Sequence, residues 1–99
     1  MRLAKVLGTV VCTRKDESIE GRKLLLVQPV DQNQKPDGNP LVAIDSVDAG
    51  VGELVLIVQG SSARMTEMTK NRPADCTIMG VVDTIAEDGK TVFKKFATD

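Results

Sequence analysis

A chain of 99 residues that is 41% hydrophobic and 27% charged has the composition of one globular domain, which we expect to span residues 1–99. Histidine is absent, and Phe93 and Phe96 are the only aromatic residues, so the commonest general base and metal ligand and the usual base-stacking side chains are missing. A net charge of −1 offers no basic excess to a phosphate backbone, and the composition therefore argues against both an enzyme and a nucleic-acid-binding protein.

The first half of the chain contains short apolar runs separated by turn-forming residues, a pattern that favours strands over long helices. A first strand is predicted at residues 3–13, where Gly8 indicates a bulge or a bend. The second strand, at residues 23–30, is apolar on both faces, so a neighbouring subunit is a candidate cover for its outer face. Residues 31–40 (DQNQKPDGNP) favour an exposed loop over a binding loop.

The middle of the chain continues with short elements around glycine. A third strand is predicted at residues 41–45 and a fourth at residues 54–59. Between them, Gly50 and Gly52 are expected to provide positive φ or a close approach of two backbones.

The last third of the chain contains the only plausible helix. It is expected from residue 62 or 63 to about residue 71, because serines can cap its first turn and Pro73 ends it. A fifth strand follows at residues 76–85, with a second bend at Gly80. The turn at residues 87–90 then leads into a last strand at residues 91–96. This order predicts an all-β fold: a small five-stranded OB-like β-barrel with one short helix and a C-terminal hairpin.

The cysteines and the N-terminal residues indicate a reducing compartment. No apolar run reaches membrane length, and no signal peptide is recognisable, so Cys12 and Cys76 are expected to stay reduced in a cytoplasm. Each lies in a short apolar run, which favours a buried packing role over the alternative of a disulfide or redox pair. Two thiols without histidine cannot form a standard zinc site, and neither a metal nor a cofactor is expected.

The turn Gly60-Ser61-Ser62 has the position of an anion-binding loop but not its sequence. It lacks the lysine of a phosphate loop, and without histidine no serine has an activating base. A helix cap is therefore favoured over a small-ligand site.

An acidic group surrounds the glycine loop. Paired carboxylates can act as an acid and a base only when an apolar cleft raises one pKa, and this composition provides no aromatic cleft. Salt bridges to Arg64 or Arg72 are therefore favoured over catalysis for the residues of this group, which are Asp45, Asp48 and Glu53.

A series of motifs runs in order through nearly the whole chain. They are Gly8-Thr9-Val10-Val11, Gly21-x-x-Leu24-Leu25-Leu26-Val27, Asp45-x-Val47-x-Ala49-Gly50-x-Gly52-Glu53-x-Val55, Gly60-Ser61-Ser62-Ala63-Arg64, Asn71-Arg72-Pro73-x-Asp75 and Ile78-Met79-Gly80-Val81-Val82-Asp83. In this order the chain resembles the EutN/CcmL family of pentameric vertex proteins of bacterial microcompartments.

The resemblance implies a structural protein of the bacterial cytoplasm. Family members form five-fold rings at the corners of polyhedral shells, and the facets of these shells consist of hexameric proteins of another family. A layer of six-fold tiles needs five-fold positions to close, and a ring of heterologous contacts supplies them. The partners implied are copies of the chain itself and facet hexamers, with no nucleic acid, membrane, cofactor or reaction.

The ring also suggests roles for particular residues. Small side chains where five copies converge would line a narrow axial opening, and the candidates are Gly60, Ser61 and Ser62. Candidates for the subunit interface are Asp48, Gly50, Gly52, Glu53, Arg64 and Arg72, whose charged members could pair between subunits.

Two other functions fit a small β protein with glycines at its bends and turns. One is a co-chaperonin-like ring subunit, which ring stoichiometry would distinguish. The other is an OB-type nucleic-acid-binding module, whose binding would fall steeply with salt.

Overall fold

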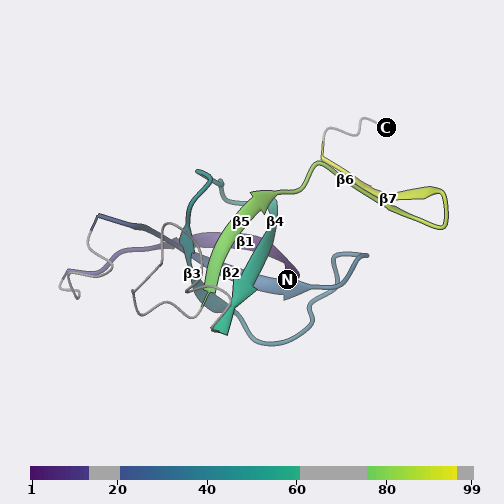
Figure 1. Cartoon of the computed structure of the whole chain (residues 1–99). Coiled ribbons are helices and arrows are strands. Elements are labelled where there is room, and N and C mark those ends of the chain that lie inside the picture. Colours follow the sequence, from purple (N-terminus) through teal and green to yellow (C-terminus); the bar gives the residue numbers. More distant parts are fainter. Residues whose placement is uncertain (14–20, 61–75, 96–99) are drawn as a thin grey trace.

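The structure, a computed structural model, describes residues 1–13, 21–60 and 76–95 (Figure 1). The strands are β1 (Arg2–Val10), β2 (Lys23–Val30), β3 (Leu41–Asp45), β4 (Leu54–Gln59), β5 (Cys76–Val81), β6 (Thr84–Glu87) and β7 (Lys90–Lys94). The short helix predicted after β4 lies outside the described residues. Across the parts of the chain that are described, no helix combines the length and hydrophobicity needed to cross a membrane.

Five of the strands form a closed barrel. Its strand order is β1-β2-β3-β5-β4, and β4 pairs with β1 to complete the circle. The neighbours are antiparallel except for β3 and β5, which run parallel. The prediction of a small five-stranded barrel is therefore confirmed, and the bounds predicted for β2, β3 and β4 match those observed.

Two β-bulges bend the barrel strands, and both lie next to a glycine that the sequence marked. In β1 the extra residue is Leu7, immediately before Gly8. In β5 it is Met79, immediately before Gly80. A bulge increases local twist and bend, which a narrow closed sheet requires. The predicted bends at Gly8 and Gly80 are thus confirmed.

The hydrophobic core fills the inside of the barrel with mostly small side chains. Strand residues alternate between the inside and the outside, as the two-residue period of a strand requires. The fully buried cluster consists of Ala4, Val6, Leu25, Val27, Ala43, Ala49, Val55, Ile57, Cys76 and Ile78. Cys76 has the packing role that was expected of it. Cys12, also a free thiol, instead lies beyond the end of β1 and is half-buried, so the expectation of a buried side chain there is wrong.

The predicted fifth strand is divided between two sheets. The Val82 N–H still donates to the Leu54 carbonyl at 2.8 Å, but β4 begins at Leu54 and offers no partner beyond it. The chain therefore leaves the barrel at Asp83, and β6 pairs with β7 in a separate two-stranded sheet. Ile85, predicted as the last residue of the fifth barrel strand, belongs to this hairpin. In Figure 1 the hairpin projects away from the barrel.

Both predicted turns at loop tips are confirmed. Asp88 and Gly89 have φ of 53° and 77°, and they form the two-residue turn between β6 and β7. The loop at residues 31–40 joins β2 to β3 and is exposed after Asp31. The Asp31 carboxylate orders its start by accepting the N–H groups of Asn33 and Lys35 at 2.8 and 3.0 Å.

Candidate assembly surface

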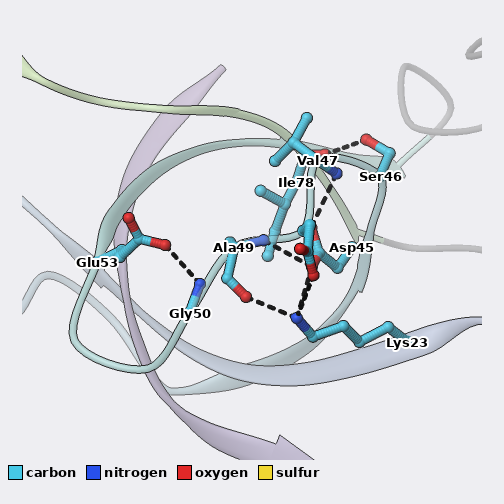
Figure 2. Close-up of polar contacts among 9 residues, drawn as sticks. Lys23, Asp45, Ser46, Val47, Ala49, Gly50, Glu53 and Ile78 are labelled. Carbon is cyan, nitrogen blue, oxygen red and sulfur yellow. Dashed lines mark hydrogen bonds and ion pairs between the residues drawn. The ribbon is translucent and has the colours of Figure 1, made fainter.

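The loop at residues 46–53, between β3 and β4, is shaped by the carboxylate of Asp45. This carboxylate is buried at the end of β3, where Oδ1 accepts the Val47 N–H at 3.0 Å and Oδ2 accepts the Ala49 N–H at 2.8 Å (Figure 2). A side chain that accepts from the backbone just after it makes the chain turn tightly. The hydroxyl of Ser46 also donates to the carbonyl of Ile78, which ties the start of the loop to β5.

Lys23 balances the buried charge of Asp45. The two residues are direct cross-strand neighbours in the β2–β3 register, and Nζ of Lys23 lies 3.4 Å from Oδ2 of Asp45. The same Nζ donates to Oδ1 of Asp48 at 3.1 Å and to the Ala49 carbonyl at 2.8 Å. The hydrogen bonds from Lys23 to Asp48 and then to Asp45 raise the pKa of Lys23 above its ordinary value. The ammonium therefore fixes both ends of the turn.

The two glycines of the loop meet separate steric requirements. Gly52 has a φ of 89°, and its N–H donates to the Val6 carbonyl at 2.8 Å. A Cβ on Gly50 would lie 3.3 Å from Oε1 of Glu53, closer than ordinary contacts allow. The prediction is confirmed at Gly52 by its positive φ, whereas the close neighbour at Gly50 is a side chain and not the second backbone that was expected. Because Val6 in turn donates to the Glu53 carbonyl at 3.0 Å, the loop is fixed to β1.

Glu53 connects the loop to the base of the β6–β7 hairpin. Oε1 accepts the Gly50 N–H at 2.5 Å, and Oε2 forms an ion pair with Nζ of Lys95, the residue after β7. The hydrogen bond from Lys95 and then that from Gly50 lower the pKa of Glu53 below its ordinary value. Glu53 is thus held as a carboxylate by both neighbours.

Apolar side chains are exposed on and beside this loop. Val47 and Val51 are 38% and 62% exposed. On the outer face of β2, Leu24 and Leu26 are half-buried, and Leu26 pairs with Val42, which is 45% exposed. A group of exposed apolar residues with a polar surround is typical of a protein–protein contact.

The structure brings together four of the predicted interface residues. Asp48, Gly50, Gly52 and Glu53 all lie on the β3–β4 loop. Both carboxylates have lysine partners within their own chain, and pairing of the same groups between subunits stays a prediction. The contacts of Arg64 and Arg72 lie outside the described residues.

The predicted pore residues lie elsewhere. Gly60 directly follows β4, at the end opposite the β3–β4 loop, where it is exposed with a φ of 63°. Ser61 and Ser62 lie outside the described residues, so an axial position for all three stays a prediction.

Sequence reasoning missed four residues of this surface. The pairing of Lys23 with Asp45 follows from strand register, which composition does not reveal. Lys95 is distant in sequence from its partner. Val47 and Val51 did carry a signal, because two valines stand in a loop otherwise rich in glycine and acidic residues.

Comparison with known proteins places these features in a family. A family profile described as "Ethanolamine utilisation protein EutN/carboxysome" matches residues 1–83. The microcompartment shell vertex protein EutN of Salmonella typhimurium is 45% identical over 95 residues, which cover 96% of each chain. The carboxysome shell vertex protein CcmL of Synechococcus elongatus is 42% identical over 95 residues, again 96% of each chain.

Solved structures agree with the sequence matches. Gloeobacter violaceus CcmL superposes with a TM-score of 0.89 at 38% identity, covering 96% of this chain and 98% of that one. The pentameric microcompartment shell protein GrpN of Rhodospirillum rubrum superposes with a TM-score of 0.79 at 44% identity, covering 88% and 99%. These matches give no support to a co-chaperonin or a nucleic-acid-binding module. The chain belongs to the EutN/CcmL family, and the relatives named above are shell vertex proteins of bacterial microcompartments, carboxysomes among them.

Proposed function

We propose that this chain is a structural vertex subunit, five copies of which form a ring that closes a microcompartment shell in the bacterial cytoplasm. The observation that carries the proposal is the superposition of pentameric GrpN at 44% identity over 99% of its length. A barrel of this shape that meets its copies through two different surfaces can close into a ring. The proposed role needs no reaction and no cofactor, in keeping with a chain that has no histidine.

The β3–β4 loop is the proposed contact to a ring neighbour. The carboxylates of Asp45 and Glu53 accept hydrogen bonds from its backbone, and Lys23 donates one to it, so little conformational entropy remains to be lost on binding. Val47 and Val51 project from this rigid loop and supply apolar surface to bury. Gly60, with Ser61 and Ser62, is proposed to face the ring axis, and hexameric facet proteins are the proposed outer neighbours.

Native mass spectrometry of the purified chain tests the ring. We expect a species with five times the mass of the 10.6 kDa chain. Val51→Asp should lower the pentamer fraction at least tenfold, because it buries a charge in the contact. Asn39→Asp adds the same charge to the exposed loop before β3 and should leave the pentamer intact. A wild-type chain that stays monomeric at micromolar concentration would overturn the proposal.

A further inference from the structure

We infer that the ion pair between Glu53 and Lys95 sets the angle of the β6–β7 hairpin against the barrel and so positions the hairpin for contact with a second copy of the chain. The two residues are positioning residues in this role. The inference rests on the proposed ring, and it adds a specific pair of side chains that determines how well the ring forms.

The β6–β7 hairpin has few strand contacts that fix its position relative to the barrel. Within the described residues, β6 and β7 pair only with each other, and Asp83 alone separates them from the last barrel hydrogen bond at Val82. Ile85, Val92 and Phe93 are half-buried, and the other residues of the two strands are exposed. An isolated two-stranded hairpin is marginally stable in water, so this one needs additional contacts.

The base of the hairpin is where it is fixed to the barrel. The Lys95 N–H donates to the Asp83 carbonyl at 2.8 Å, which closes the base, while the Lys95 side chain reaches Glu53. The Lys95 and Glu53 side chains are 26% and 23% exposed, so both are largely shielded from water. Because Gly50 also holds the Glu53 carboxylate, the ion pair connects the hairpin to a rigid loop.

The contact near the hairpin tip is weaker. Nε2 of Gln32 lies 3.5 Å from Oε1 of Glu87, at the limit of a hydrogen bond, and both residues are exposed. A hairpin of this length extends about 15 Å, so a tilt of about 10° at its base moves the tip by roughly 2–3 Å. That displacement is enough to separate packed surfaces, and the pair at the base therefore controls where the tip lies.

A second copy is the partner that this arrangement fits. A ring of heterologous contacts needs two different surfaces on each chain. The ion pair fastens the hairpin, with its partly uncovered apolar side chains, to the same loop that exposes Val47 and Val51. The Glu53–Lys95 pair thus joins the base of the hairpin to the loop, and the position of the hairpin's surface relative to the loop depends on this pair.

Lys95→Gln tests the inference, because it removes the ammonium and leaves the backbone hydrogen bond to Asp83 in place. Lys94→Gln, at the exposed neighbouring lysine, is the matched control. Hydrogen exchange of the β6–β7 amides should be about two- to fivefold faster in Lys95→Gln, the range expected for one partly exposed ion pair. The Lys95→Gln pentamer should dissociate at a higher protein concentration than the wild-type pentamer, and this shift is amplified because the ring contains five equivalent contacts. Lys94→Gln should match wild type in both measurements.

Glu53→Gln completes a double-mutant cycle, since its amide oxygen can still accept the Gly50 N–H. Adding Glu53→Gln to Lys95→Gln should cause little further increase in hairpin exchange or pentamer dissociation, because the Glu53–Lys95 ion pair is already absent in the Lys95 variant. Unchanged exchange of the barrel amides verifies the fold of each variant. Equal behaviour of Lys95→Gln and Lys94→Gln, additive losses in the cycle, or faster hairpin exchange with an undisturbed ring would each overturn the inference. If the wild type forms no pentamer, the proposed function fails, whereas hairpin exchange still decides whether the pair fixes the hairpin.

Discussion

The carboxylate of Asp45 is the residue on which the proposed contact loop most depends. Its side chain is fully buried, and it accepts two backbone N–H groups while Lys23 supplies the compensating charge. A buried carboxylate is unfavourable unless it is paired and hydrogen-bonded, and Asp45 satisfies both conditions. The loop conformation and the burial of this charge therefore stabilise each other.

Asp45→Asn should destabilise the fold although it preserves the shape of the side chain. The amide nitrogen cannot accept an N–H, so one backbone donor loses its partner, and the expected loss is about 1–3 kcal/mol in the free energy of unfolding. Urea denaturation monitored by circular dichroism measures it. Asp48→Asn is the control, because that side chain is 94% exposed, and it should have little effect. Equal losses in the two variants would contradict the role assigned to Asp45.

The residues of this loop were predictable from sequence to different degrees. Gly52 indicates by its residue type a backbone requirement that the structure shows as a positive φ, whereas the space at Gly50 is limited by the side chain of Glu53. Lys23 resembles any other surface lysine until the β2–β3 register places it opposite Asp45. Side-chain partners that depend on strand register cannot be inferred from residue type alone.

At the scale of elements, strand boundaries were predictable where turn residues flank an apolar run. β2, β3 and β4 have such flanks, and their observed bounds match the prediction. The run that begins at Cys76 contains Gly80 and Asp83 on either side of Val81, but single turn-forming residues did not identify Val81 as the end of β5. That end is set by the tertiary structure, because β4 offers no partner beyond Leu54.

Gly52→Ala should show how much the loop depends on backbone conformation. At a φ of 89° an alanine is strained, and the expected loss is about 1–2 kcal/mol, although no atom stands where the Cβ would be. Gly8→Ala is a matched control, since its Cβ also meets open space but its φ is not positive. The control should stay within about 0.5 kcal/mol of wild type in the same urea titration. A Gly8 variant as unstable as the Gly52 variant would show that backbone conformation is not the cause.

For the whole molecule, the residue pattern predicted the barrel, whereas the five-fold assembly was predicted through the family resemblance. Bulge-forming glycines at Gly8 and Gly80, five short strands and a small-residue core all indicate closure of one small sheet. Symmetry is a property of several chains, and the only trace of it in one chain is apolar surface that its own fold leaves uncovered. The half-buried outer face of β2 is such a trace, and the two-sided apolar pattern of residues 23–30 did predict it.

If that uncovered surface is buried in a ring, stability must depend on protein concentration. Unfolding of a pentamer releases five chains, so a tenfold rise in concentration stabilises each chain by about 1 kcal/mol. For a domain of this size, 1 kcal/mol corresponds to a rise in Tm of about 4–8 °C. Differential scanning calorimetry across two decades of concentration measures the shift directly. Val51→Asp, which should separate the subunits, should unfold at a lower Tm that does not change with concentration. A wild-type Tm that is equally insensitive to concentration would mean that the exposed valines and the outer face of β2 contribute nothing to a stable ring.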